Sequence, residues 1–284
     1  MIRSKGVAIF AWLFLGLLAA TMIVPLLNVL ATSFSSAADS LSPGIVFWPD
    51  PISFAGYETL FRRLNFWLPF MNTLYVTVVG TIVHVLLASL AGYALAQEDL
   101  PGRQWIGGII LVTLTIPTQT IMVPLFIVFR DFGLLNTLFS LIVAELISAF
   151  SILLMKTYFE QVPRQVIESA KIDGAGHFRL FWDFYVPLAL PGIVTITAFN
   201  IVWKYNLFIE PLLFINDPDK ITLQIALRAV TLGGDGASVT STNDFIAPNT
   251  MMAGIVVALV PLLLFYPFMQ RYLVSGLALG GVKE

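Results

Sequence analysis

The sequence predicts an all-α integral membrane protein, and three features of its composition and patterning support that prediction. Hydrophobic residues make up 58% of the 284 residues and charged residues only 11%, whereas soluble domains carry about 25% charged residues. The mean hydropathy is +0.88. Six apolar segments reach the length of about 20 residues that an α-helix needs to cross a bilayer. We therefore expect six membrane helices and no large domain outside the membrane.

The six predicted spans are interrupted in several places by proline. They cover residues 7–32, 70–97, 105–129, 138–158, 186–215 and 250–273. Prolines lie in or beside the third, fifth and sixth spans, at Pro117, Pro124, Pro187, Pro191, Pro211, Pro261 and Pro267. Proline frees a backbone carbonyl, and a bilayer tolerates such a group only beside protein or a water-filled cavity. The breaks therefore fit a pathway through the protein, with simple kinked packing as the alternative.

The first span resembles a secretory signal in having Arg3 and Lys5 before its apolar run. The run is longer than the 7 to 15 apolar residues of a typical signal peptide. We therefore expect an uncleaved span. Cleavage near residues 31–38 is the alternative.

Basic residues predict the orientation of the chain, because they are more frequent in cytoplasmic loops. With the N-terminus inside, the inner basic residues are Arg3, Lys5, Arg103, Lys156, Arg164, Lys171, Arg179, Arg271 and Lys283. The outer ones are Arg62, Arg63, Arg130, Lys220 and Arg228. This bias of nine against five predicts that both termini are cytoplasmic.

A polar, amphipathic loop, residues 159–185, separates the fourth and fifth spans. Pro163 suits a first helical turn, and Gly174 after Asp173 suits a left-handed helix end, so we expect a helix between them. A second short helix is expected around residues 177–183. The pair either docks onto a soluble partner or lies on the membrane surface, as amphipathic segments beside a span often do.

This loop resembles the EAA loop of ABC importer permeases, in which E-A-A is followed by three residues, glycine, nine residues and I-x-L-P. The resemblance implies a coupling helix that docks onto a cytoplasmic ATPase through Glu168, Ser169, Ala170, Asp173, Gly174 and Ala175. Pro187 matches the final proline. Ser169, Phe184 and Val186 depart from the pattern, each by a residue of tolerable size or character.

Two further stretches narrow the resemblance to carbohydrate-uptake permeases of the smaller maltose-permease-subunit type. The C-terminal signature is matched by Gln270, Arg271, Tyr272, Gly276, Gly280, Val282 and Lys283. A W-N-x-x-x-x-P-L segment of the fifth span is matched by Trp203, Asn206, Pro211 and Leu212, and an NT pair by Asn72 and Thr73. The resemblance covers residues 1–284 as a single permease domain. It implies the six-helix type I ABC importer fold with a coupling helix between spans 4 and 5.

The resemblance also implies the function and the partners. The chain would form half of the translocation pathway of an ATP-driven sugar or oligosaccharide importer in the bacterial cytoplasmic (inner) membrane, working by alternating access. A second homologous permease, a dimer of ABC ATPase carrying ATP and Mg, and an extracytoplasmic substrate-binding protein would complete it. The chain has no G-x-x-x-x-G-K-[ST] sequence and binds no cofactor itself, so ATP hydrolysis falls to a partner. The binding protein would contact Gly233, Gly234, Asp235 and Gly236, with a solvated loop as the alternative.

Charged residues inside spans are costly and are candidates for function. Lys204 and Glu210 are six positions apart, about 240° around an ideal helix, so each needs another partner. Aromatic, amide and charged groups suit a sugar, and an anionic sugar would account for the lysine. The predicted substrate pathway is therefore Trp203, Lys204, Tyr205, Asn206 and Glu210. For Glu145 we expect interhelical pairing or hydrogen bonding, and for His84 a hydrogen-bonded packing role.

Other functional classes are less consistent with the sequence. Its lack of cysteine excludes disulfides, thiolate catalysis and Cys-ligated zinc, and its net charge of −2 gives no nucleic-acid surface. Neither an HExxH nor a GxSxG motif is present, so we expect no catalytic residues, no metal site and no enzyme activity. Two alternatives stay open. One is an ion-coupled secondary transporter, which an inverted repeat would favour; the other is an ABC importer of a non-sugar solute.

Overall fold

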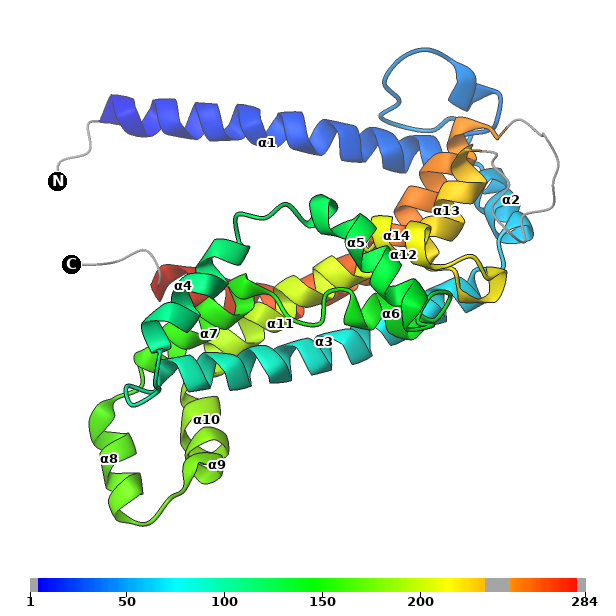
Figure 1. Cartoon of the computed structure of the whole chain (residues 1–284). Helices are drawn as coiled ribbons and strands as arrows, with labels where there is room; N and C mark the ends of the chain where they lie inside the picture. Colours follow the sequence, from blue (N-terminus) through cyan, green and yellow to red (C-terminus); the bar gives the residue numbers. More distant parts are fainter. Residues whose placement is uncertain (1–4, 233–245, 280–284) are drawn as a thin grey trace. The chain divides into compact units, whose positions relative to one another are not determined.

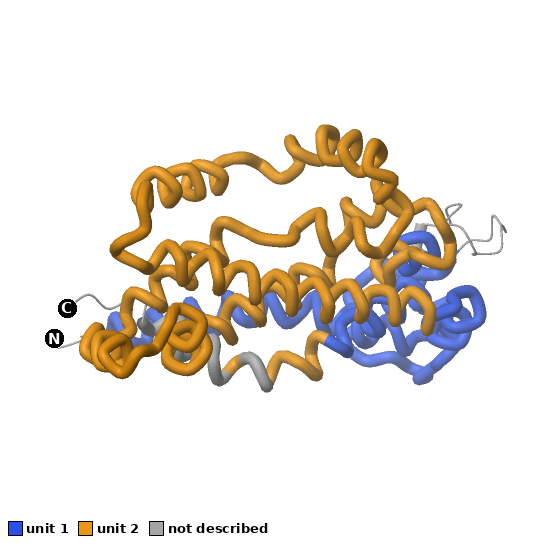
Figure 2. Tube along the Cα trace, turned by 60° about the horizontal axis from the view of Figure 1, so that its bottom comes forward, with its two compact units in different colours: residues 1–66, 226–261 blue, residues 67–225, 262–284 orange. Residues whose placement is uncertain are grey.

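The computed structural model describes residues 5–232 and 246–279, and in that part all regular elements are helical. The all-helical class expected from the sequence is therefore confirmed. The chain forms two compact units, coloured separately in Figure 2: unit 1 comprises residues 1–66 and 226–261, and unit 2 comprises residues 67–225 and 262–284. The boundary falls within two helices, α13 (Leu223–Leu232) and α14 (Pro248–Leu279).

Unit 1 contains α1 (Lys5–Ser33), η1 (Asp39–Leu41) and α2 (Ala55–Arg63). The most apolar stretch of α1 has no buried residues, as expected for a helix whose sides face lipid. The amide of Asn249 donates to the carbonyl of Ser35 over 3.1 Å. A side chain at Gly56 would lie 2.9 Å from the Asn249 carbonyl oxygen, so glycine permits this close approach.

Unit 2 is built on the long helix α3 (Trp67–Ala96), against which α6, α7 and α11 pack (Figure 1). Its other elements, in order, are α4 (Arg103–Thr113), α5 (Thr118–Asp131), α6 (Leu138–Val143), α7 (Ala149–Glu160), α8 (Arg164–Ile172), α9 (His177–Arg179), the π-helical η2 (Leu180–Tyr185), α10 (Val186–Leu188), α11 (Leu190–Tyr205), α12 (Ile209–Phe214) and η3 (Pro218–Lys220).

Three described helices, α1, α3 and α14, are each long and apolar enough to cross a membrane. The number rises to five if each bent pair is one span. These pairs are α4 with α5, bent by 98°, and His177–Leu188 with α11, bent by 78°. Pro117 caps the start of α5, as expected for a proline break, whereas α14 continues through Pro261 and Pro267. The predicted fourth span is divided between the short helices α6 and α7.

Two glycines let three helices of unit 2 approach one another closely. A Cβ at Gly92 of α3 would lie 2.6 Å from the Met155 Cβ and 2.9 Å from the Lys156 nitrogen of α7. At Gly192 of α11 a Cβ would clash with the ring of Tyr158. Small residues of this kind allow membrane helices to pack backbone against backbone. α7 is therefore held tightly between α3 and α11.

The Asn72–Thr73 pair ties the start of α3 to the segment that follows α12. The Asn72 amide donates to the carbonyls of Asp219 (2.9 Å) and Ile221 (3.0 Å). The Thr73 hydroxyl accepts the backbone N–H of Leu223 over 2.8 Å. These bonds give the pair a structural role at the end of unit 2 opposite α8 (Figure 1).

Candidate functional site

The EAA-like loop forms α8, a left-handed turn and the short elements α9, η2 and α10. The backbone N–H of Gly174 donates to Lys171 and that of Ala175 to Ala170, at 3.0 and 2.9 Å. Gly174 has φ of 82°, a value that costs a residue with a Cβ about 1–2 kcal/mol. This pair of bonds is a Schellman motif. The glycine cap expected from the sequence is confirmed.

The predicted coupling residues do not all point the same way. Ala170 is buried and Ala175 is half-buried, whereas the other four are exposed: Glu168, Ser169, Asp173 and Gly174. Ala170 packs in a cluster with Ile167 and Leu180 that joins α8 to η2. One edge of α8 therefore fixes the helix to its own chain, and the other edge is free to meet a partner.

Aromatic side chains hold the base of this loop against α3. The ring of Tyr93 meets Phe181 and Tyr185 edge-on, with centroids 5.3 and 5.0 Å apart, and Phe159 meets Tyr185 at 5.6 Å. Such pairs contribute about 0.5–1.5 kcal/mol each beyond the area they bury. The Tyr93 hydroxyl also bonds Nδ1 of His177 over 3.0 Å. The second half of the loop is thus fixed by packing and by one hydrogen bond.

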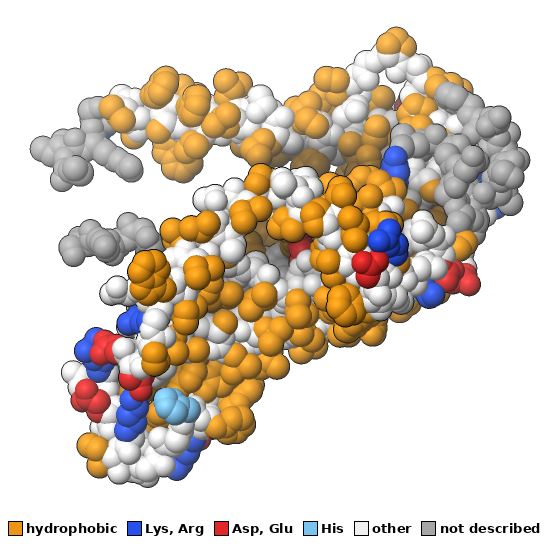
Figure 3. Space-filling view, viewed as in Figure 1, with side chains coloured by type: hydrophobic (Ala, Val, Ile, Leu, Met, Phe, Trp, Pro, Cys, Tyr) orange, Lys and Arg blue, Asp and Glu red, His pale blue; other side chains and the backbone are white. Residues whose placement is uncertain are grey.

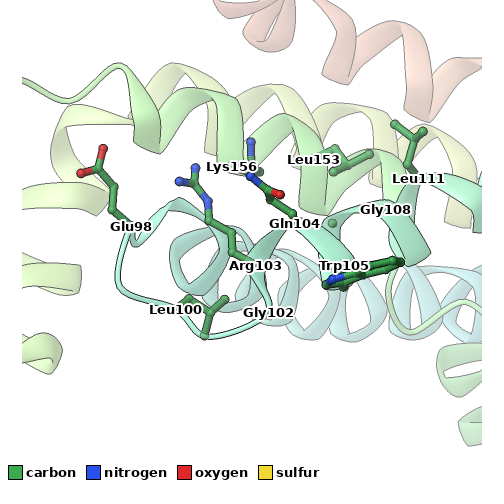
Figure 4. A pocket seen from close by; sticks show the side chains of 11 residues that line it. Glu98, Leu100, Gly102, Arg103, Gln104, Trp105, Gly108, Leu111, Leu153 and Lys156 are labelled. Carbon is green, nitrogen blue, oxygen red and sulfur yellow. The ribbon is translucent and has the colours of Figure 1, made fainter.

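Ion pairs add a second attachment at the same end of unit 2. Glu160, at the end of α7, pairs with both Arg103 of α4 and Lys156, the latter over 3.0 Å. Glu98, in the turn after α3, pairs with Arg164 at the start of α8. Figure 4 shows Arg103, Lys156 and Glu98 around an open cavity of about 820 Å³. The loop is therefore attached to the ends of both α3 and α4.

Charge gathers at this end on the face seen in Figure 3. Acidic and basic side chains and a histidine cover the α8–α9 region, while hydrophobic side chains cover the face along α3 to α7. Glu168 and Lys171 of α8 line a further cavity of about 490 Å³ beside the turn after α3. A charged, projecting helix next to an apolar body is suited to contact with a soluble protein.

A second site, also within unit 2, is a mainly apolar cavity of about 770 Å³ lined by α5, α11, α12 and α14. Its residues with hydrogen-bonding or aromatic groups include Gln119, Phe199, Trp203, Asn206, Glu210 and Tyr266. Phe199 and Trp203 of α11 and its C-cap residue Asn206 recur at a spacing of four and three, so they share one face of the helix. Two amides, a carboxylate and several aromatic rings therefore line one cavity. Three of the five predicted pathway residues are among them.

The other two predicted pathway residues, Lys204 and Tyr205, lie in the interior. Only 1% of Lys204 is exposed. Its Nζ donates to the carbonyls of Leu141 (2.9 Å) and Ile142 (3.4 Å) at the end of α6. Its methylene groups run past Gly80 of α3, where a Cβ would come within 3.3 Å of the lysine Cε. The lysine therefore joins α11 to the end of α6 across α3.

Residues 144–148 form a break between α6 and α7, and side chains of other helices hold it. Glu145, within the break, accepts a hydrogen bond from the indole N–H of Trp203. Ser148 caps α7 by accepting the Ser151 backbone N–H over 3.1 Å, and the Ser151 hydroxyl bonds Nε2 of His84 over 2.8 Å. The interhelical pairing expected of Glu145 and the packing role expected of His84 are both confirmed.

Comparison with known proteins identifies the class to which these two sites belong. The family model of the binding-protein-dependent transport system inner membrane component matches residues 84–278, which include the α8 loop and the cavity residues of α11 and α12. The chain belongs to this family. It is a multi-pass permease of the inner membrane and a transport component, not an enzyme. The family implies an ATPase, a binding protein and a partner permease.

Individual permeases match over nearly the whole chain. The polygalacturonan/rhamnogalacturonan transport system permease protein YtcP of Bacillus subtilis is 34% identical, over 95% of this chain and 96% of its own. An arabinooligosaccharides transport system permease protein, AraQ of Halalkalibacterium halodurans, is 28% identical over 99% of each chain. A bacterial ABC transporter involved in import of the acidic polysaccharide alginate matches in structure, with TM-score 0.83, 28% identity and coverage of 96% and 99%. The expected resemblance to importer permeases is confirmed.

Sequence reasoning missed several residues of this permease's two sites. Gln119, Phe208 and Tyr266 line the cavity, but no local pattern reveals which way their helices are rotated. The break before α7 had a signal, since Ser148 is a good N-cap residue directly before an apolar run. The predicted binding-protein contacts lie outside the described residues: Gly233, Gly234, Asp235 and Gly236.

Proposed function

We propose that this permease is one half of the membrane pathway of an ATP-driven importer of sugars or oligosaccharides. The proposal gives it six spans, with α6 and α7 together as the fourth, both termini in the cytoplasm, and one permease domain over residues 1–284. Its partners would be a second homologous permease, a dimer of ABC ATPase and an extracytoplasmic binding protein that meets residues 233–236. The carbohydrate relatives support the choice of substrate class.

The observation that carries the proposal is the capped, half-exposed helix α8. Its buried edge, with Ala170, is fixed to η2, while Glu168, Ser169 and Asp173 stay exposed beside a left-handed turn that favours glycine. A docking helix needs both features, because it must transmit force to its own chain and present a free surface. ATP-driven closure of the ATPase dimer would move α8. Only three residues separate α8 from the end of α7, so α7 would transmit that movement to the break at residues 144–148.

For the substrate, we propose contact with Trp203, Asn206 and Glu210 in the cavity of about 770 Å³. Sugars have apolar ring faces and polar edges, so an indole beside an amide and a carboxylate suits them. Lys204 and Tyr205 would support this wall from the interior. Substrates named for related permeases include both neutral and acidic saccharides, so trigalacturonate and arabinotriose form a suitable first pair of probes.

The docking part is tested by three variants of the turn in the complete complex, purified through a tag on this chain. Gly174→Ala adds only a small side chain but strains the cap. Gly176→Ala is a matched control, because Gly176 is extended, with an ordinary negative φ of −77°, and has open space around it. Asparagine tolerates positive φ, so Gly174→Asn retains the cap and adds bulk. We expect the first and third variants to lose the ATPase on purification and the control to keep it.

Each outcome of this experiment has a distinct meaning. Rescue by Gly174→Asn would show that only the cap matters and that the partner does not approach closely. Retention of the ATPase in all three variants would contradict docking at this turn. In proteoliposomes holding the complete importer, ATP-dependent uptake of trigalacturonate or arabinotriose would support the substrate class, and uptake of neither would count against these two sugars.

A further inference from the structure

We propose that Glu145 is a positioning residue for substrate, acting through Trp203: its carboxylate fixes the indole ring in the orientation that lines the cavity. This inference deepens the proposed sugar pathway and rests on it. Glu145 is not a lining residue of the cavity itself. Its connection to substrate is the hydrogen bond that it accepts from the indole N–H.

The need for such a bond follows from the exposure of Trp203. The side chain is 55% exposed and projects from the last turn of α11, where the helix ends at Tyr205. Packing alone therefore restrains it little. A ring that stacks on a sugar must be held at a fixed angle, because the cost of ordering it would otherwise be taken from the binding free energy. A hydrogen bond from the indole N–H to a carboxyl oxygen of another segment supplies such a restraint, because it is directional.

Glu145 can serve as a fixed anchor only because its own backbone is held. It lies in the break between α6 and α7. In a continuous helix, backbone N–H groups of the next turn would donate to the last carbonyls of α6, but the break removes these donors. Lys204 satisfies two of these carbonyls, at Leu141 and Ile142. Trp203 and Lys204 are adjacent in α11. One turn of that helix therefore donates hydrogen bonds both to the side chain of Glu145 and to the backbone just before the break. The break therefore leaves backbone carbonyls to which Lys204 can donate, and these bonds hold Glu145 in place beside Trp203.

The arrangement also connects the cavity to the coupling loop. The break leads directly into α7, and three residues separate the end of α7 from the start of α8. A sugar resting on Trp203 would thus press on the same junction that α7 moves. We infer that Glu145 keeps the sugar platform and the fourth span together during the transport cycle.

The test uses the full-length chain, labelled with 5-fluorotryptophan, in lipid nanodiscs. Among the six tryptophans of the chain, the ¹⁹F resonance of Trp203 is the one that Trp203→Phe removes. We expect Glu145→Leu to shift and broaden that resonance, and Glu145→Gln, which keeps an acceptor oxygen, to restore it. Asp131→Leu is the control, since Asp131 is an exposed carboxylate paired with Arg130 at the opposite end of α5 from Gln119, and it does not line the cavity. An unchanged resonance in Glu145→Leu would overturn the proposal.

Titration of the same resonance with arabinotriose and with trigalacturonate supplies the second measurement. For whichever sugar shifts it, we expect the apparent Kd to rise about tenfold in Glu145→Leu and to return to within about twofold in Glu145→Gln, a loss of about 1.4 kcal/mol in the first case. An equal Kd in all variants would contradict positioning for substrate. If neither sugar binds, the proposed sugar pathway is contradicted for these two sugars. The ¹⁹F resonance of the sugar-free protein still decides separately whether Glu145 orients Trp203.

Discussion

At the coupling-loop end of unit 2, charged side chains pair with one another near the surface, whereas at the cavity end a buried charge is satisfied by the backbone. Arg103 and Lys156 are each 27% exposed and share Glu160. Lys204 is 1% exposed and donates to two carbonyls of α6. The two ends use the same kinds of residue in different dielectric surroundings.

The difference indicates which end can rearrange. Exposed ion pairs contribute about 0–1 kcal/mol and are screened by salt, so they can break and reform during a cycle. Buried polar groups cost far more when they lose a partner. We therefore expect the α8 end to adapt to a moving partner and the junction of α6, α7 and α11 to behave as a rigid piece.

The largest effect is expected at the buried lysine. Lys204→Met retains much of the volume and removes the donor, leaving the carbonyls of Leu141 and Ile142 unsatisfied at about 1–3 kcal/mol each. Lys220→Met is the control, because Lys220 is 41% exposed and pairs only locally with Asp217. Thermal unfolding of the purified chain measures both. If the two variants lose equally little thermal stability, the buried lysine is no more important for stability than an exposed one, and the proposed difference between the two ends is wrong.

A smaller loss is expected where α3 meets α7, near the coupling-loop end of unit 2. Gly92→Ala would place a methyl group 2.6 Å from the Met155 Cβ and 2.9 Å from the backbone nitrogen of Lys156, which cannot swing away. Overpacking of this kind costs about 1–3 kcal/mol. Gly107→Ala is the matched change, because Gly107 lies in helix α4 with open space around it. If both variants unfold at the wild-type temperature, close packing of α3 on α7 does not stabilise the coupling-loop end.

The coupling-loop end was the more predictable from sequence, for a physical reason. A helix end is determined by consecutive residues, so Pro163 and Gly174 sufficed to predict the bounds of α8, Arg164–Ile172, to within a residue or two. The attachments of that loop were not predicted. They depend on which residues of α3 and α4 reach it, such as Glu98 and Arg103.

The cavity depends on helix rotation, which the sequence did not determine. Trp203 and Lys204 were assigned one role because they are neighbours in a motif-bearing span. In a helix, neighbours point about 100° apart, and here one lines the cavity while the other enters the interior. Spacing did reveal that Lys204 needed a partner other than Glu210. The sequence did not reveal that this partner is the backbone of α6, because those carbonyls are free only where the helix breaks at residues 144–148.

The surface pairs lead to a third prediction, with a smaller effect. Glu160→Gln removes the shared partner of Arg103 and Lys156, and we expect a loss of about 0–1 kcal/mol at low salt. The loss should shrink as salt rises, because exposed charges are screened over about 10 Å at 0.1 M. Unfolding temperatures of wild type and variant, compared across a salt series, measure this. A salt-independent loss would mean that Glu160 behaves like the buried groups.

The smallest effect, at the end of unit 2 opposite α8, depends on pH. Asp217 accepts hydrogen bonds from the Lys220 ammonium (2.9 Å) and the Asp219 backbone N–H (3.0 Å), and these bonds lower the pKa of its carboxyl below the ordinary value. A carboxyl with a lowered pKa stabilises the folded state above its unfolded pKa, and the contribution is lost as pH falls through the folded pKa. Asp217→Asn should therefore be slightly less stable than wild type at neutral pH.

The stabilities of the two proteins should begin to converge as pH falls below about 4, the pKa of an ordinary aspartate, and should meet below the lower pKa of Asp217 in the folded state. Unfolding temperatures at several pH values test this, with Asp131→Asn as the control, since Asp131 pairs with Arg130 at a site 60% exposed. A gap between wild type and Asp217→Asn that persists unchanged into acid would mean that the side chain acts through its shape and not through its charge. Because Asp217 also caps η3, next to the carbonyls that Asn72 binds, a pH-dependent gap would show that this end of unit 2 is held, like the α8 end, by a pair that solvent conditions can weaken.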